Sequence, residues 1–212
     1  TKNMSLVNGA LLGNTTLASR GVATGNAGNL SMNISDNLSI DGSIIFNSVD
    51  RGNPTDRVEG SAGNIDLKTG SLTMTNKARI QNSTISVGNT GNIYIDANNS
   101  IDLSGNSRIF STNVFGTGRV GNIKIGANNL SLTEDSLISN TNAFGASEPG
   151  NIEINARNTI SLNKSNIVNG NVQGVEEEGR SGSIAIDTKN LFLVNNARIF
   201  TNSTLSKKKK LF

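Results

Sequence analysis

The feature that most constrains this chain is a short phrase that returns at separations of 28 to 35 residues. Each copy is Gly-Asn followed by two apolar residues one position apart, as in GNIYI and GNIKI, and the last copy, GSIAI, has Ser in place of Asn. The copies stand at Gly28-Asn29, Gly63-Asn64, Gly91-Asn92, Gly121-Asn122, Gly150-Asn151 and Gly182. Self-similarity at this period is typical of solenoids and repeat arrays.

The apolar residues within each repeat alternate with polar ones, which indicates strands. In the third full copy they fall into three segments: Ile93 with Ile95, Ile101 with Leu103, and Ile109 alone. This period of two excludes the helical repeat classes. We therefore predict an all-β fold, a right-handed parallel β-helix of about six to seven coils with roughly 30 residues and three short strands each.

The predicted domain spans residues 1–206, with a partial coil over 1–27 and further coils beginning near residues 28, 63, 91, 121, 150 and 182. A basic tail follows at 207–212. A single coil buries too little apolar surface to fold alone, so stability must come from stacking.

The Gly-Asn pairs are predicted to serve as structural corners. Glycine there is expected to adopt a positive φ, which other residues rarely tolerate. The asparagines suggest ladders of stacked side-chain amides, and the alternative is that Asn is simply a good turn former.

The spacing within a coil is nearly constant, and the spacing between coils is not. From the first apolar residue after Gly-Asn to the apolar residue of the third segment the distance is 15 or 16 residues, with Phe46 taken as that residue in the first full coil. The following connection varies, and insertions at one connection map to one edge of a solenoid, often its binding edge.

These variable connections contain the candidate partner-contact residues Phe115, Phe144, Glu176, Glu177 and Glu178. The two phenylalanines occupy matching places in adjacent coils. They are candidates for contacts with a partner, although we favour the alternative that they fold back over the apolar edge of the rod. The glutamates are expected on the solvated surface.

Outward positions of the first segment also form columns across coils. Lys124 is expected beside Glu153, and Lys68 beside Asp96, as cross-strand pairs that help to set the register.

Composition removes several classes of chemistry. The chain has no Cys and no His, so disulfides, thiolate or imidazole metal sites and Ser-His or Cys-His nucleophiles are excluded. The carboxylates do not recur in one column, and we assign no catalytic, metal or cofactor-binding residue. The net charge of +3 includes four lysines at Lys207 to Lys210, so the rest of the chain carries −1 and indicates no nucleic-acid face. No stretch is apolar enough for a transmembrane segment.

The coils resemble those of bacterial filamentous haemagglutinin-type exoproteins, the large secreted partners of two-partner secretion systems. The Gly-Asn pairs carry the resemblance, together with the phrases LTMTNKARI and LFLVNNARI, and it covers essentially the whole chain.

The resemblance implies a secreted or cell-surface, adhesin-like rod without catalytic residues. It also implies export of the full-length protein through an outer-membrane pore, and a cell-surface glycan or protein as receptor. The alternative is a β-helical polysaccharide lyase, hydrolase or carbohydrate-binding module. A role as a pure spacer is also open. The first residues do not have the pattern of a signal peptide, so we expect a piece of a longer protein or a mature segment. We interpret the lysine tail as the result of a truncated or frameshifted gene. The alternatives are that the lysines discourage edge-to-edge association of the sheets, or that they are attracted to a membrane or nucleic acid.

Overall fold

The computed structural model describes residues 1–18, 21–51, 57–85, 87–114, 118–142, 149–171 and 181–202. Over these residues the chain is all-β and contains no helix. The strands are β1 (Asn3–Leu6), β2 (Leu11–Ala18), β3 (Val22–Thr24), β4 (Leu30–Asp41), β5 (Ile44–Arg51), β6 (Arg57–Glu59), β7 (Ile65–Thr75), β8 (Arg79–Thr84), β9 (Ile93–Ala97), β10 (Ser100–Leu103), β11 (Arg108–Asn113), β12 (Ile123–Thr133), β13 (Leu137–Asn142), β14 (Ile152–Asn163), β15 (Asn166–Asn171), β16 (Ile184–Val194) and β17 (Arg198–Asn202).

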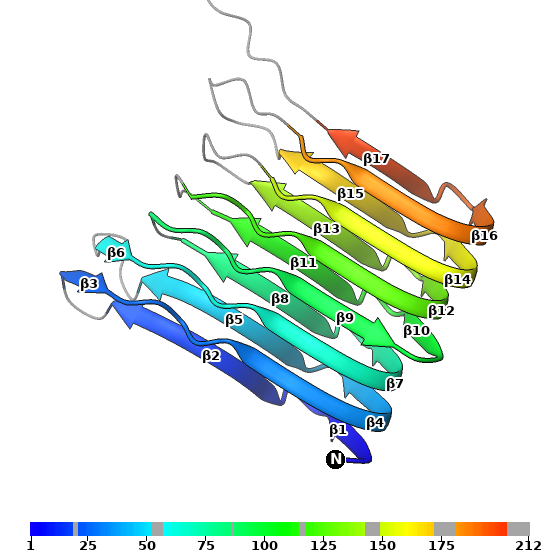
Figure 1. The fold of residues 1–212 in the computed structure, drawn as a ribbon, viewed down its shortest axis with the longest axis horizontal. Coiled ribbons are helices and arrows are strands. Elements are labelled where there is room, and N and C mark those ends of the chain that lie inside the picture. The colour runs from blue at the N-terminus through cyan, green and yellow to red at the C-terminus, as the bar shows by residue number, and fades with distance from the viewer. Residues whose placement is uncertain are drawn as a thin grey trace, which may run out of the picture.

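The strands stack as a parallel β-solenoid of about six turns, which confirms the predicted fold class. One sheet, called sheet A here, runs β1-β4-β7-β10-β12-β14-β16, with β9 between β7 and β12. The second, sheet B, runs β17-β15-β13-β11-β8-β5-β2, and β3 pairs with β6 in a small third sheet. Figure 1 shows successive coils side by side in chain order.

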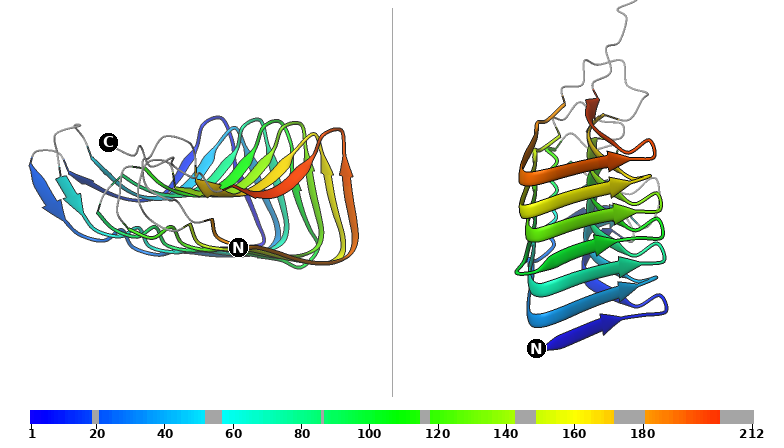
Figure 2. Two further views of the ribbon diagram at one scale, coloured as in Figure 1. Left: turned by 90° about the horizontal axis from the view of Figure 1, so that it is seen from above. Right: turned by 90° about the vertical axis from the view of Figure 1, so that its right-hand side faces the viewer.

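Each coil has three faces, but not the three separate strands expected from the sequence. Figure 2 shows that the long strands of sheet A bend along their length, so one strand supplies two faces and a strand of sheet B supplies the third. Register shifts at the bend, such as that between Ala127 and Asn129, mark an irregular residue that turns the strand without ending it. Only in the coil that contains β9 and β10 does the strand break at this corner.

In every full coil except that of β9 and β10, the two corners compensate for each other in length. In the coil of β9 and β10 the bend spans 97 to 101 and the turn spans 103 to 109, so that coil is one residue longer. Where the bend of sheet A spans positions 34 to 38, the turn into sheet B spans 40 to 45; where the bend is shorter, at 69 to 72, the turn is longer, at 74 to 80. The inward residue of β5 is Ile45, which is fully buried, and the expectation for Phe46 was wrong because Phe46 alternates to the outer side. With Ile45 in place, the spacing is 15 residues here as well.

Left-handed backbone occurs at the turn from sheet A into sheet B. In the turn Thr75 to Ala78, both central residues have positive φ, 55° at Asn76 and 65° at Lys77, and the Ala78 N–H donates to the Thr75 carbonyl at 3.1 Å. This is the geometry of a two-residue turn with both central residues left-handed. The same pair of positive φ values recurs at Glu134 and Asp135.

Lys77 offers a test of this turn. Replacing Lys77 by Gly is expected to raise the free energy of unfolding by about 0.5 kcal/mol, since relief of left-handed strain exceeds the added entropy of the unfolded chain. Thermal unfolding followed by circular dichroism measures the change. Lys68→Gly, within strand β7, is the matched control and is expected to destabilise. Equal losses for both variants would contradict the turn geometry.

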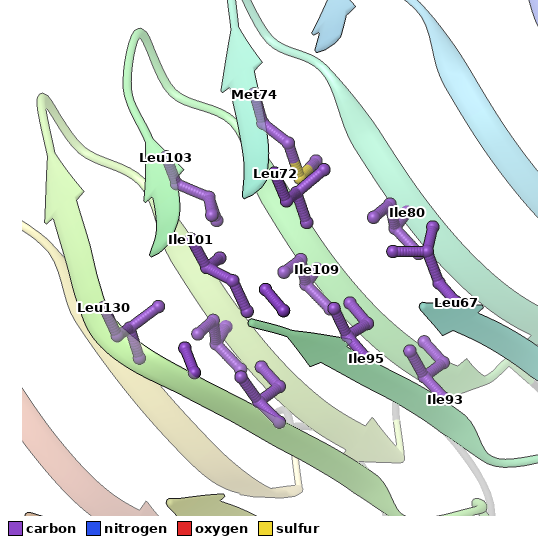
Figure 3. Close-up of a cluster of buried hydrophobic side chains, with 14 of the residues drawn as sticks. Leu67, Leu72, Met74, Ile80, Ile93, Ile95, Ile101, Leu103, Ile109 and Leu130 are labelled. Atoms are coloured by element: carbon purple, nitrogen blue, oxygen red, sulfur yellow. The ribbon is translucent and has the colours of Figure 1, made fainter. Parts of the chain in front are cut away.

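The interior between the sheets is filled by stacked Ile and Leu side chains. In Figure 3, Ile93 and Ile95 of β9 and Ile101 and Leu103 of β10 lie in one such cluster, and each is at most 2% exposed. Because each inward residue contacts its counterparts in the coils above and below, no coil has a complete core of its own.

Candidate functional site

The topology places all the variable connections on one edge of the solenoid. Each runs from the end of a sheet B strand to the Gly-Asn pair that precedes the next sheet A strand. The predicted contact residues Phe115, Phe144, Glu176, Glu177 and Glu178, and the tail at Lys207 to Lys210, lie outside the described residues. The described part of this edge comprises the paired strands β3 and β6 and the segments that carry the Gly-Asn pairs.

The glycines of these pairs do not have the positive φ expected from the sequence. The described glycines with positive φ are Gly9, Gly21, Gly42, Gly105 and Gly170, and the Gly-Asn glycines are not among them. Glycine is required for a different reason, because a Cβ would overlap the backbone of the preceding coil. This holds at Gly63 against Gly28, Gly91 against Gly63, Gly121 against Gly91, Gly150 against Gly121 and Gly182 against Gly150. Gly28 begins the column and has space.

A second glycine column runs three residues earlier, and the sequence analysis missed it. A Cβ at Gly60, Gly88 or Gly118 would overlap the carbonyl of the preceding member, which begins at Gly25. The signal was present in the sequence as the longer phrase Gly-x-x-Gly-Asn, which is complete in four coils. Two glycine columns therefore let the backbones of this edge approach each other closely.

The asparagines of the pairs form a ladder, in which side-chain-to-backbone bonds predominate and one amide-to-amide bond of the expected kind, from Asn92 Nδ2 to Asn64 Oδ1 at 3.4 Å, is present. The Oδ1 atom of each Asn accepts from the backbone N–H of the next coil: Asn29 from Asn64 at 2.8 Å, Asn64 from Asn92 at 2.9 Å, Asn92 from Asn122 at 2.8 Å, Asn122 from Asn151 at 2.7 Å, and Asn151 from Ser183 at 2.9 Å. Each side chain therefore fixes the spacing between two backbones.

A buried polar column inside sheet B faces this edge, and the sequence analysis assigned it no role. Asn47, Asn82, Asn140 and Asn169 are fully buried, and each donates through Nδ2 to the carbonyl of the glycine in its own coil, at 2.7 to 2.8 Å. Their Oδ1 atoms are buried without a hydrogen-bond partner. The column joins sheet B to the glycine backbone, where apolar side chains would leave the carbonyls unpaired.

One coil replaces this contact with a pair of hydroxyls. Ser111 occupies the Asn position there, and its Oγ lies 2.8 Å from Oγ1 of Thr90 in the buried interior. Thr90 Oγ1 also accepts from the backbone N–H of Gly121 at 2.7 Å. The two hydroxyls therefore connect sheet B to the glycine segment through each other and through the Gly121 N–H.

Outside the ladder lies a polar groove of about 530 Å³. Its floor is glycine backbone at Gly121, Gly150 and Gly182, and Asn122 and Arg119 line its sides. Because the Oδ1 of Asn122 is engaged within the ladder, the amide offers its Nδ2 as a donor, and Arg119 adds charged donors. The groove therefore presents mainly donors to anything that enters it.

The outer face of sheet A carries the predicted charged columns. Lys124 and Glu153 are register partners, and their Nζ and Oε1 atoms lie 2.8 Å apart. Lys68 and Asp96 are register partners as well, but no ion pair joins them within the described residues. The first pair confirms the predicted contact, and the second is a neighbour pair without one.

Exchanging Lys124 and Glu153 is expected to change the free energy of unfolding by less than about 0.5 kcal/mol, because both side chains are more than half exposed. Chemical denaturation of the exchanged variant measures this. A large loss would show that the pair contributes more than register.

Comparisons with models of known protein families, with curated proteins and with solved structures found no match. Among the described residues, carboxylate side chains do not gather in a group of three or more that would hold a metal ion. Across that same part of the chain, no helix has the length and hydrophobicity to cross a membrane.

Proposed function

We propose that the chain is a non-catalytic repeat segment of a secreted or cell-surface, adhesin-like exoprotein, and that the β-helix acts as a rigid rod for adhesion or display. The observation that carries the proposal is the continuous parallel pairing of strands from β1 to β16 in sheet A and from β2 to β17 in sheet B. A stack of this kind holds attached groups at fixed spacing and is extended simply by adding coils. Export through an outer-membrane pore, and a surface glycan or protein receptor, belong to the same proposal.

The contrast between inner and outer columns supports a display role. The inward column begins with Leu30 and continues with Ile at each of the next five coils, whereas the adjacent outward column reads Ser31, Asp66, Tyr94, Lys124, Glu153 and Ala185. The inward column therefore keeps a large aliphatic residue in each coil, while the residue type in the outward column differs from coil to coil. A scaffold that carries different groups on a constant frame has this distribution.

Adhesion by the rod is testable with beads that carry the purified chain. Retention under flow on mammalian cells, bacterial cells and glass is compared with beads that carry the Gly121→Val variant, whose stacking is disrupted. We expect at least a tenfold excess of retention on one surface. The double variant Phe115→Ser with Phe144→Ser tests whether the rod itself or the variable connections bind the surface. Retained adhesion would place binding on the rod. Lost adhesion would place it in the connections that contain these two residues.

The enzyme alternative is excluded or established by a second assay. The chain is incubated with a panel of acidic and neutral polysaccharides, and released oligosaccharides are measured. Product release that the Gly121→Val variant lacks would overturn the proposed non-catalytic role. Binding without release is the expected result.

A further inference from the structure

A second groove, of about 330 Å³, lies on the outer face of sheet A. It is lined by Asp66, Lys68, Tyr94, Asp96, Gly126 and Asn155, among others. These residues come from two adjacent outward columns of strands β7, β9, β12 and β14. The groove is thus built on paired strands within the regular sheet, away from the variable edge.

Gly126 opens this groove, and stacking does not require a glycine there. Its neighbours in the column are Asp96 and Asn155, and it alone among these three lacks a side chain. A Cβ at Gly126 would meet only the Oδ1 atom of Asp96, at 3.0 Å, and no backbone atom within 4 Å. Its φ is not positive either. Glycine within a strand lowers stability and often marks a place where a ligand approaches closely.

Tyr94 also lines this groove and is the single tyrosine of the chain. Within the described residues, Tyr94, Asp66, Asp96 and Lys68 make no hydrogen bond or ion pair with another side chain. The groove therefore combines an aromatic ring with two carboxylates and an ammonium whose hydrogen-bonding capacity is not used by the fold. These groups can bind a ligand without breaking a side-chain hydrogen bond or ion pair of the fold.

We propose that this groove binds a single neutral pyranose unit of a glycan. A pyranose has an apolar C–H face that packs on an aromatic ring, and hydroxyls that donate to carboxylates. Lys68 lies beside the carboxylates of Asp66 and Asp96, and the ammonium of Lys124 is already paired with Glu153, so the groove carries only a small net negative charge and lacks a free cluster of cations that would select an anion. Its volume of about 330 Å³ is at the small end of the range for ligand sites, which is consistent with a single sugar ring. The proposal rests on the proposed function, since it names a ligand for the displayed surface.

The chain contains its own reporter for this site, because it has one tyrosine and no tryptophan. Tyrosine emission of the purified chain is followed during titration with the methyl glycosides of glucose, galactose, mannose, xylose and N-acetylglucosamine, and with sorbitol as the acyclic control. We expect a saturable change with at least one glycoside and none with sorbitol. Absence of any saturable change would overturn the proposal.

Two variants keep the reporter and alter the groove. Gly126→Val fills the space that the missing side chain of Gly126 leaves in the groove, and Asp96→Asn removes one charged acceptor. We expect each to weaken glycoside binding at least tenfold. Ser131→Val, on the same strand β12 outside the groove, is the matched control and should bind as the native chain does. Circular dichroism verifies that all three fold. Native affinity in Gly126→Val, or saturation by a tetralysine peptide in place of any glycoside, would overturn the proposal.

Failure here is distinguishable from failure of the proposed function. The bead and polysaccharide assays do not depend on Tyr94. Their results therefore stand even if the emission of Tyr94 does not change during the glycoside titration. Conversely, polysaccharide cleavage would overturn the non-catalytic role even if the glycoside titration succeeded.

Discussion

Replacing Gly121 by Ala is expected to lower the free energy of unfolding by about 3 kcal/mol, the upper end of the usual cost of overpacking. The added Cβ would overlap the carbonyl of Gly91 in the preceding coil. Backbone atoms on both sides of this contact are held by the Asn ladder, so the strain is not relieved by rotation of a side chain. Urea denaturation followed by circular dichroism measures the loss.

Gly28→Ala is the matched control for this experiment. Gly28 belongs to the same column and has no positive φ, but the nearest atom to an added Cβ is Nδ2 of Asn14, at 3.9 Å. We expect the change in unfolding free energy to stay within about 0.5 kcal/mol, as at an unstrained surface site. Equal losses at Gly28 and Gly121 would show that backbone approach between coils is not why glycine is needed.

Replacing the buried Asn140 by Ser is expected to cost about 2 kcal/mol. The shorter side chain cannot supply the 2.7 Å bond from Nδ2 of the buried Asn140 to the Gly121 carbonyl, which loses this partner in a part-buried setting. Ser is tolerated at the equivalent position 111 because Thr90 supplies a hydroxyl partner, whereas the coil of Asn140 has Val120 at that place.

The double variant Asn140→Ser with Val120→Thr copies the natural hydroxyl pair into the next coil. We expect it to recover about 1 kcal/mol relative to the sum of the two single variants, measured as a double-mutant cycle by urea denaturation. Strict additivity would falsify the interpretation that the amide and the hydroxyl pair are interchangeable connections between sheet B and the glycine backbone.

Much of the fold was predictable because the relevant signal is local. Alternation of apolar and polar residues determines which side chains point inward, and this correctly assigned Ile93, Ile95, Ile101 and Leu103 to one coil. The same alternation failed at Phe46, where two consecutive apolar residues, Ile45 and Phe46, left the inward position ambiguous. Only the register with Ile80 resolved it.

The candidate sites were less predictable because they depend on what lies in the next coil. Asp96 was placed in its column from the sequence, yet the importance of Gly126 beside it follows only from the space around the Cβ position of Gly126. The buried Asn column was equally hidden, since Asn82 and Asn140 read as ordinary polar residues of a third strand. Their partners are carbonyls 19 residues earlier in the chain.

The sequence by itself determined that this chain forms a parallel β-helix, since a period-two pattern repeated about every 30 residues has few other ways to bury its apolar side. The tertiary structure explains why the repeated residues are glycine and asparagine and not other turn-forming residues. Glycine prevents a collision between neighbouring coils, and Asn binds the backbone of the coil beside it or a carbonyl across the interior. The glycine contacts and the Asn ladder join neighbouring coils, where residues about 30 positions apart are stacked about 5 Å from each other. The buried Asn contacts cross the interior of one coil and join residues 19 positions apart.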